Sequence, residues 1–482
     1  AGALAPGVAP GLHTVGAMLP YTGLHHLLFA KLDVPLVMTS ANLPGRPMLI
    51  DNDEIVERLN GIADHFLLHD RRIAARCDDS VRRRVGGAMV FLRRSRGYVP
   101  GPIEVPFDVA VLALGPETDV TFAIADGGKA TLSQHIGSVD DLETLSFLES
   151  AIEHLYRITH ASDPVRIACD LHRAFSTTRL ARELAARHGA EVVPVQHHVA
   201  HLCSVMAEHG AEKAVGIILD GYGYGWDGEA WGGEILVASD RVVSRAGSLM
   251  PVRLPGGDQA ARHPLRMAAA FLHAAGIEAA DVVRRLVARG MAAQEAEVLC
   301  AQIERGLNAP WTTSAGRFLD AVAAWLGICT ERTYEGEPAM RLEAAAVRGT
   351  PLPIEPALRE VDGRLVVDTA SLFCELVQLA ETHGMEDVAA TAQHALAAGA
   401  GRMALIAAER AGVETIAFSG GVAYNDAIAT SLRRLARAHG LILLSNERVP
   451  CGDGGVSFGQ AVYAGCGYGV LEADRTDAAS GG

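Results

Sequence analysis

The sequence predicts a two-lobed α/β protein, because a similar succession of strands and helices occurs twice along the chain. The first succession begins with short apolar runs at residues 109–114, 121–125 and 130–133, which are separated by Gly-Pro and Asp-Gly-Gly turn signals. The second begins with apolar runs at residues 214–220 and 230–238. Two similar units favour two lobes with a ligand-binding cleft between them.

Each of the two copies continues with helices and further strands. In the first copy, Ser138 opens a Ser-x-x-Asp capping box, and leucines at helical spacing follow it, so we expect an amphipathic helix from this point. The remaining expected elements are strand 166–170, helix 176–188 ended by Gly189, strand 191–195, a long helical region after residue 238, strand 414–419, helix 425–439 and strand 441–445. Alternating strand and helix units also recur in α/β proteins without an internal repeat, and this alternative stays open here.

Composition places the chain among cytoplasmic enzymes rather than nucleic-acid or membrane proteins. The 482 residues carry 42 basic and 57 acidic side chains, a net charge of -15, which disfavours nonspecific binding to nucleic acid or to an anionic membrane. Eight cysteines lie far apart and form no CxxC pair, so reduced thiols are expected. No uninterrupted apolar run approaches the ~20 residues that span a bilayer. We therefore expect a cytoplasmic protein with no membrane or nucleic-acid partner.

A basic, Pro- and Gly-containing stretch at residues 93–102 separates two parts of the chain. Before it, short apolar runs alternate with Pro and Gly, whereas the repeated α/β units follow it. The stretch therefore predicts a domain edge and linker, with domains at residues 1–105 and 106–482.

Three histidines occur within residues 196–201 (QHHVAH), directly after an expected strand. His197 and His201 are four residues apart and share one face of a helix, a spacing that suits two imidazoles on one metal ion. The segment lacks the glutamate of the HExxH protease motif. The alternative is a helix start with hydrogen-bonded or solvated histidines; three histidines in six residues favour the metal.

Two glycine-rich segments predict a nucleotide site. Residues 220–228 (DGYGYGWDG) follow an apolar strand, so glycine amides can approach a phosphate and Asp220 can bind a metal. Residues 418–425 (FSGGVAYN) read as a strand, a glycine turn and an Asn at a helix N-cap. Neither segment is a Walker loop, which needs GK[ST], or a Rossmann GxGxxG motif that opens a helix. A tight hairpin and ordinary capping are the alternatives, although they do not explain the doubled glycine.

Two other kinds of chemistry fit the sequence less well. Asp453, in residues 450–461, offers a further oxygen ligand, while Cys451 beside it has no adjoining histidine that would activate it as a nucleophile. A serine hydrolase with a Ser-His-Asp triad is the other, less favoured alternative, although residues 455–459 (GVSFG) match the letters of the GxSxG pattern. A metal site therefore remains the favoured interpretation.

The motifs together resemble those of the HypF carbamoyltransferases of [NiFe]-hydrogenase maturation. They occur in the family's order and cover nearly the whole chain: residues 132–137 (LSQHIG), 196–201, 220–234, 254–258 (LPGGD), 312–320 (TTSAGRFLD), 333–336 (TYEG), 419–425 and 453–460 (DGGVSFGQ). Residues 18–22 (MLPYT), 24–28 (LHHLL) and 38–43 (MTSANL) look like the second half of the family's YrdC-like domain. The rest is similar to its TsaD-like domain, a two-lobed member of the actin and sugar-kinase superfamily.

This resemblance implies specific site residues. A divalent metal, Fe²⁺ or Zn²⁺, would be held by His197, His201, Asp220 and Asp453, the first three of which are also the implied catalytic residues. Two histidines and two carboxylates suit these ions better than Mg²⁺. The nucleotide contacts implied by the resemblance are Ser40, Asn42, Gly221, Gly223, Gly327, Glu335, Gly421 and Asn425.

The resemblance also implies a reaction and a partner. Carbamoyl phosphate and ATP, with Mg²⁺, would give carbamoyl-adenylate, and the TsaD-like domain would pass the carbamoyl group to the C-terminal cysteine of HypE for cyanide ligand synthesis. The acylphosphatase domain, the zinc fingers and the first half of the YrdC-like domain have no counterpart in this sequence. We therefore expect a partial YrdC-like domain at residues 1–105, in a natural or artificial fragment that depends on another source of carbamoyl-adenylate.

Three other functions are compatible with some of these motifs. A small-molecule O-carbamoyltransferase shares them, but its TsaD-like domain comes first. Threonylcarbamoyl transfer to tRNA would need a nucleic-acid partner, which the net charge of -15 disfavours. A truncated scaffold that binds HypE without turnover is the non-enzymatic alternative.

Overall fold

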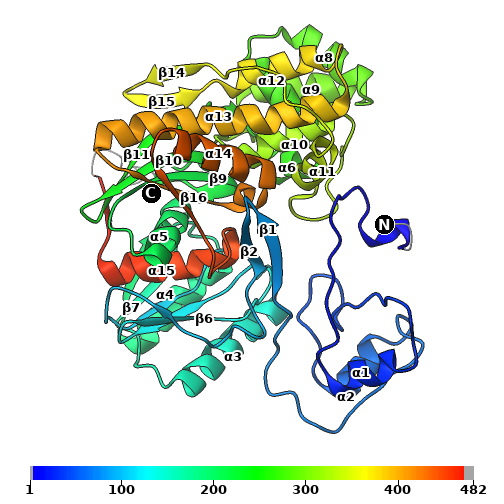
Figure 1. The fold of residues 1–482 in the computed structure, drawn as a ribbon, viewed down its shortest axis with the longest axis vertical. Coiled ribbons are helices and arrows are strands. Elements are labelled where there is room, and N and C mark those ends of the chain that lie inside the picture. Colours follow the sequence, from blue (N-terminus) through cyan, green and yellow to red (C-terminus); the bar gives the residue numbers. More distant parts are fainter. Residues whose placement is uncertain (1–3, 472–482) are drawn as a thin grey trace.

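The computed structural model describes residues 4–471 and contains two lobes built on separate sheets (Figure 1). The six-stranded sheet of the first lobe has the order β3-β6-β5-β4-β7-β8. Its strands are β3 (Ile103–Glu104), β4 (Val111–Ala113), β5 (Ala123–Asp126), β6 (Lys129–Leu132), β7 (Arg166–Asp170) and β8 (Glu191–Val195).

The second lobe is built on a ten-stranded sheet. Its main path is β14-β15-β11-β10-β9-β16-β17, with β12, β13 and β18 at the side. The strands are β9 (Ala214–Tyr224), β10 (Ala230–Ser239), β11 (Val242–Leu249), β12 (Val252–Arg253), β13 (Trp311–Thr312), β14 (Leu358–Val361), β15 (Arg364–Val367), β16 (Thr415–Ser419), β17 (Ile442–Ser445) and β18 (Gly469–Val470).

The two lobes share one topology, so the predicted two-lobed α/β fold is confirmed. In the first lobe β4, β5 and β6 form an antiparallel meander, and β7 and β8 join it in parallel. In the second lobe β9, β10 and β11 form the same meander, and β16 and β17 join it in the same directions. In both lobes the three strands of the meander are followed, next to the first of them, by the two parallel strands: β6-β5-β4-β7-β8 and β11-β10-β9-β16-β17. The same strand order in both lobes indicates an internal repeat, and not only the alternation of strands and helices that is common in α/β proteins.

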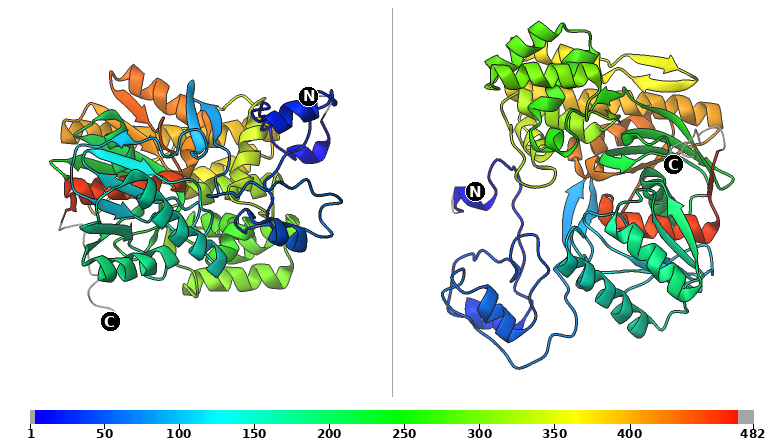
Figure 2. Two further views of the ribbon diagram at one scale, coloured as in Figure 1. Left: turned by 90° about the horizontal axis from the view of Figure 1, so that it is seen from below. Right: turned by 180° about the vertical axis from the view of Figure 1, so that it is seen from behind.

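Helices cover both sheets and also lie between them (Figures 1 and 2). In the first lobe α3 (Leu142–Thr159) and α4 (Ser176–His188) pack on the outer face of the sheet. Between the two sheets lie α5 (His197–His209) and α15 (Val456–Cys466). The second lobe contributes α6 (Asp258–Arg262), α7 (Leu265–Ala274), α8 (Ala279–Ala288), α9 (Ala293–Arg305), α10 (Ala315–Trp325), α11 (Glu337–Ala346), α12 (Thr369–Leu379), α13 (Met385–Ala411) and α14 (Asp426–Ala438), besides the 3-10 turns η2 (Gly421–Tyr424) and η3 (Asp453–Gly455).

The two central helices exchange partners between the lobes. Helix α5 follows the first sheet in sequence but packs on β9 and β16 of the second, whereas α15 follows the second sheet and packs on β4 and β7 of the first. The two helices touch through their backbones, because a Cβ added at Gly459 would overlap the carbonyl oxygen of Ala200. Glycine at this position lets the helices approach closely.

Residues 4–80 lie beside the lobes and contain little regular structure (Figures 1 and 2). Their elements are η1 (Pro6–Val8), α1 (Gly23–Phe29) and α2 (Asn52–Arg58). Leu19 and Val37 are 84% and 81% exposed, so this segment leaves much apolar surface uncovered. Ion pairs from Arg58 to Glu143 and from Arg46 to Asp141 connect it to the start of α3.

A hairpin joins this segment to the lobes. Its strands β1 (Val81–Val85) and β2 (Ala88–Arg93) pair with each other, and Val85 and Val90 enter the core of the second lobe. The amide of Gly86 donates to Asp426 at 2.7 Å, at the start of α14. The end of the N-terminal part is therefore anchored on the second lobe.

Two local predictions were wrong. Helix α3 begins after Asp141, whose carboxylate accepts from the amides of Glu143 and Thr144, and not at Ser138. The glycine-rich segment after Asp220 continues strand β9 as far as Tyr224, since its backbone pairs with β10, and the turn comes after it. Among the described residues, no helix combines the length and apolar character needed to cross a bilayer.

We predict that Gly459→Ala lowers the free energy of unfolding by about 3 kcal/mol, because the added methyl group would force α15 and α5 apart. Urea titration followed by circular dichroism measures the change. Gly469→Ala is the matched control: its Cβ would meet open space, so its effect should stay within about 0.5 kcal/mol. Equal stability of the two variants would contradict the close contact.

We predict that Asp141→Ala lowers the free energy of unfolding by about 1 kcal/mol through the loss of the cap on α3, while Ser138→Ala has little effect. Asp141→Asn should retain most of the stability, because its amide oxygen still accepts from the first turn. The urea midpoints of the three variants check this. A larger loss for Ser138→Ala than for Asp141→Ala would place the start of the helix at the capping box.

Candidate metal centre

The alternation of side chains along β9 directs Asp220 towards α5. Val215, Ile217 and Leu219 point into the outer core of the second lobe, whereas Ala214 and Ile218 point into the core around α5. Asp220 shares the face of the second set, since successive strand residues point to opposite faces. The period of a buried strand thus places a carboxylate opposite the first turn of α5.

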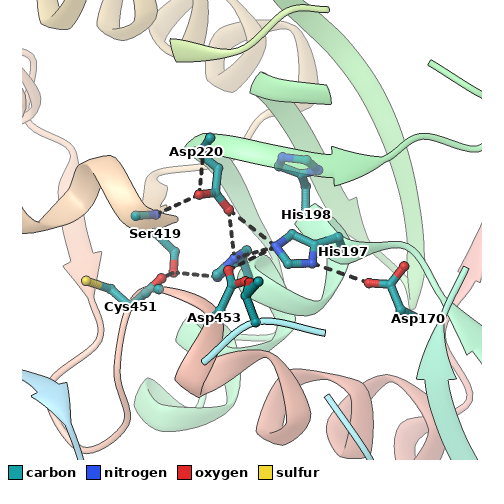
Figure 3. A network of polar contacts seen from close by, with 12 residues as sticks. Asp170, His197, His198, Asp220, Ser419, Cys451 and Asp453 are labelled. Atoms are coloured by element: carbon teal, nitrogen blue, oxygen red, sulfur yellow. Dashed lines mark hydrogen bonds and ion pairs between the residues drawn. The ribbon is translucent and has the colours of Figure 1, made fainter. Parts of the chain in front are cut away.

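Four predicted metal ligands meet at this point (Figure 3). The Nε2 atoms of His197 and His201 lie 3.2 Å apart, and they lie 3.3 and 3.1 Å from Oδ2 of Asp220. Oδ1 of Asp453 lies 3.4 Å from Nε2 of His197. One ligand atom of each residue falls within 4.8 Å of all the others. The histidines come from the start of α5, Asp220 from β9 and Asp453 from the turn before α15.

These distances fit a bound divalent ion. Two ligand atoms at about 2.0–2.1 Å from a tetrahedral ion lie roughly 3.3 Å apart. The closest pairs in the cluster have this separation without further movement. Nitrogen and carboxylate ligands together favour Fe²⁺ or Zn²⁺ over Mg²⁺. The residues present therefore suit the kind of ion that the sequence predicts.

A second set of residues orients the ligands. Nδ1 of His197 lies 3.3 Å from Oδ2 of Asp170, at the end of β7, and Nδ1 of His201 lies 3.4 Å from Oγ of Ser419, at the end of β16. Thr118 donates to Oδ2 of Asp453 at 2.7 Å. A carboxylate or hydroxyl on the outer nitrogen fixes the tautomer and the ring orientation of a ligating histidine. Both imidazoles thus present Nε2 to the centre of the cluster.

The electrostatics of the cluster favour a positive charge at its centre. Burial alone lowers the pKa of the His197 imidazole, but the carboxylates of Asp453, Asp170 and Asp220 outweigh burial and raise it well above its usual value. Burial alone raises the pKa of the Asp220 carboxyl, but hydrogen bonds with His197 and His201 hold it well below its usual value. Buried carboxylates therefore require a cation, which is either a proton on an imidazole or a metal ion.

His198 belongs to the same segment but faces another environment. Burial and the neighbouring His197 hold the pKa of its imidazole well below the usual value, so the ring is neutral. Nδ1 of His198 lies 3.0 Å from the side-chain nitrogen Nε2 of Gln196, and Nε2 of His198 has no hydrogen-bond partner among the described residues. The middle histidine therefore supports the helix start and lies outside the ligand set.

The glycines near the cluster have packing roles. A Cβ at Gly223 would lie 2.5 Å from the His198 ring, so glycine here lets α5 approach β9. Gly420 adopts φ +96°, and an added Cβ would overlap the carbonyl group of Leu219. The amides of Gly221 and Gly421 donate to Oδ1 of Asp220 at 2.8 and 3.1 Å. These contacts explain the doubled glycine at the end of β16 through close packing and ligand positioning.

The other predicted nucleotide contacts divide between positions near and far from the cluster. Surrounding protein atoms and the negative charges of Asp453 and Asp119 raise the pKa of the Glu335 carboxyl to about 7, with a smaller contribution from Asp220. The Glu335 side chain is nevertheless exposed to solvent. The first residues of α10 contact Gly221, whereas Gly327 follows the last residue of this helix. The length of α10, about 16 Å, therefore separates Gly327 from Gly221.

Asn425, Ser40 and Asn42 have partners within the protein. Asn425 is the N-cap of α14, as predicted, and its amide nitrogen donates to Gln393 at 2.8 Å. Ser40 donates to Asn42 at 2.6 Å in the segment beside the lobes. The structure thus gathers the metal ligands, Gly221, Gly223, Gly421 and Glu335 around one centre, and it leaves Gly327, Ser40 and Asn42 elsewhere.

Sequence reasoning did not identify the residues that orient the ligands. Asp170 ends β7 in the first copy and Ser419 ends the matching strand β16 in the second, so the ends of these strands were a usable signal. Thr118 carried no such signal, because it reaches the cluster only through long-range packing.

Family models match three parts of the chain. Residues 216–460 match the model described as "Carbamoyltransferase, Kae1-like Domain, second subdomain", and residues 107–208 match "HypF Kae1-like domain". Residues 1–95 match a Sua5, YciO and YrdC model described as "Telomere recombination". The first of these matches along the chain ends at residue 95, and the next begins at residue 107.

Curated relatives carry the same family name. The probable carbamoyltransferase HypF of Methanocaldococcus jannaschii is 43% identical over 94% of this chain and 59% of its own length. Carbamoyltransferase HypF2 of Cupriavidus necator is 40% identical over 95% of this chain and 61% of its own length. A HypF homolog of the same organism is 36% identical, with 73% of this chain and 91% of its own length covered. The chain thus spans about three-fifths of the first two relatives.

Solved structures agree with this relationship. HypF of T. kodakarensis superimposes with a TM-score of 0.91, at 40% identity, over 98% of this chain and 63% of the other. Full-length HypF in a phosphate- and nucleotide-bound form gives a TM-score of 0.90, at 34% identity, over 96% of this chain and 72% of the other. With family models, relatives and structures in agreement, the chain belongs to the HypF carbamoyltransferase family.

Proposed function

We propose that this chain transfers a carbamoyl group from carbamoyl-adenylate to the thiolate of the C-terminal cysteine of HypE, a step in cyanide ligand synthesis for [NiFe] hydrogenases. The observation that carries the proposal is the cluster of His197, His201, Asp220 and Asp453 in a member of this family. Carbamoyl phosphate, ATP and Mg²⁺ would be needed earlier, to make the adenylate.

The four ligand residues would hold Fe²⁺ or Zn²⁺. When bound, such an ion supplies Lewis-acid chemistry that polarises a carbonyl group. The protein contributes a site whose ligand atoms are already oriented: two amides fix Asp220, Asp170 fixes His197, and Ser419 fixes His201. Such positioning lowers the cost of forming the reactive arrangement.

Burial of the cluster suits a reactive carbamoyl donor. His197 and His201 are 3% and 1% exposed, while Asp453 is more open and marks the accessible side. A carbamoyl-adenylate is a mixed anhydride that water would hydrolyse, so a site that excludes water protects it until the thiolate attacks. In that step the new S–C bond forms and AMP leaves with the electron pair of the broken C–O bond.

We predict that His197→Ala and Asp453→Ala each reduce the bound metal to below a tenth of the content of the unchanged protein, because each removes one of four ligands. Elemental analysis after dialysis measures the metal. His188→Gln, at an exposed position on α4, is the control and should retain full content. Circular dichroism checks that each variant is folded. Full metal content in both ligand variants would refute the assignment.

We predict that the protein loaded with metal carbamoylates HypE when carbamoyl-adenylate is supplied, and that His197→Ala slows this at least 100-fold. Intact-mass spectrometry of HypE and measurement of AMP release follow the reaction. Supplying the adenylate separates transfer from adenylation, since the segment of residues 4–80, which contains the predicted contacts Ser40 and Asn42, lies beside the lobes (Figure 1). Transfer only to an aminoglycoside hydroxyl would identify a small-molecule carbamoyltransferase. No AMP release at all would identify a scaffold.

A further inference from the structure

A cavity of about 250 Å³ adjoins the metal centre and has no role in the proposed function so far. The hairpin of β1 and β2, the first lobe and the turn before α15 each contribute to its walls. The lining residues are Val81, Leu92, Arg93, Arg94, Asp119, Thr121, His135, Pro450 and Gly454. Gly454 follows the ligand Asp453, so the cavity borders the turn that carries one of the metal ligands.

The walls carry guanidinium groups with hydrogen-bond donors that the protein does not use. The guanidinium of Arg93 makes no hydrogen bond or ion pair within residues 4–471, although the residue is half-buried in the cavity wall. Arg94 is 6% exposed; it donates only to the carbonyls of Tyr98 and Gly101, and its Nη1 has no hydrogen-bond partner in the same part of the chain. Buried guanidinium nitrogens normally find acceptors, so this wall offers donors for an anion.

Other titratable groups line or border the cavity. Asp119 is the only carboxylate among its lining residues, against two guanidinium groups. His135 adds no charge, because burial and the nearby Arg93 lower its pKa from the usual value. Asp453 and Asp78 lie outside the lining and act electrostatically on Asp119 and His135. The case for an anion therefore depends on the guanidinium of Arg93, which has no hydrogen-bond or ion-pair partner within residues 4–471, and not on a net charge. His135 lies in residues 132–137, a motif whose residues have no part in the ligand set.

The volume of the cavity limits the size of the ligand that carries the anionic group. Sites for cofactors and comparable ligands occupy about 300–1,000 Å³, more than this cavity provides. A single amino-acid residue fits, and a residue at the end of a chain carries a free carboxylate. In a terminal cysteine the thiol and the carboxylate are separated by three bonds, roughly 3–4 Å. A residue with so short a reach suits a cavity that borders the turn carrying Asp453.

We propose that this cavity binds the chain-terminal carboxylate of the acceptor cysteine, with Arg93 as the residue that recognises it. The proposal rests on the proposed function, because it requires an acceptor thiol at the metal centre. It gives the site a specificity that the metal ligands lack: a cysteine followed by further residues, or by an amide, has no carboxylate for Arg93.

The test compares two synthetic peptides that end in cysteine and differ only in a free carboxylate or a C-terminal amide. Their binding to the metal-loaded protein is measured by calorimetry, so the readout does not depend on turnover. We predict that the acid binds 10- to 100-fold more tightly than the amide, the usual range for a charged hydrogen bond. Arg93→Met should abolish this preference and weaken only the acid.

Arg84→Met is the matched control, since Arg84 is exposed on the same hairpin and does not line the cavity. It should keep the full preference for the acid. Thermal melting checks that all variants are folded. Equal binding of acid and amide, or an unchanged preference in Arg93→Met, would overturn the proposal and leave carbamoyl transfer intact.

A competition experiment with inorganic phosphate tests whether the cavity binds a phosphate group instead of a carboxylate. If phosphate binds in the cavity with Arg93 dependence while the acid peptide does not compete with it, the cavity serves a phosphate group and the proposal is wrong. Conversely, a retained preference for the acid peptide in a protein that releases no AMP from carbamoyl-adenylate would support the cavity's role and refute the proposed reaction.

Discussion

The backbone contact between α5 and α15 is the constraint on which the rest of the structure depends. Only glycine at position 459 allows the carbonyl of Ala200 to lie so near, and the two helices then fill the space between the sheets. Because each helix packs on the sheet of the other lobe, the lobes cannot separate without breaking this core. A metal centre that draws ligands from both sides therefore forms on a fixed frame.

The same exchange of helices explains where the ligands come from. Helix α5 carries the ligands His197 and His201 and lies on β9, which carries Asp220, while the turn that starts α15 carries Asp453. Burying these groups is costly unless they are paired, and the pairing is incomplete without a cation. The surrounding carboxylates raise the pKa of His197, which is the direction expected for a site that needs a cation.

Sequence periodicity predicted the parts of the fold that depend on local pattern. Strands β7 and β8 and helix α4 have the predicted bounds, because each combines a regular apolar period with a clear end signal such as Gly189. The start of α3 could not be predicted as securely, since Ser138 and Asp141 both suit a cap and the chain path decides between them. The ligand set followed from motif order, whereas Thr118 depends on a contact across hundreds of residues.

The glycine-rich segments show why a motif identifies a family more reliably than it assigns roles. Residues 221–224 extend β9 instead of forming the predicted turn, and a Cβ at Gly223 would overlap the ring of His198, while the nucleotide contacts at Gly221 and Gly223 stay predictions. The amides of Gly221 and Gly421 serve Asp220 rather than pointing freely into solvent. Glycine here brings a strand end, a turn and a helix close enough for four side chains to share one ion. The geometry of the metal centre alone is sufficient reason for glycine at these positions.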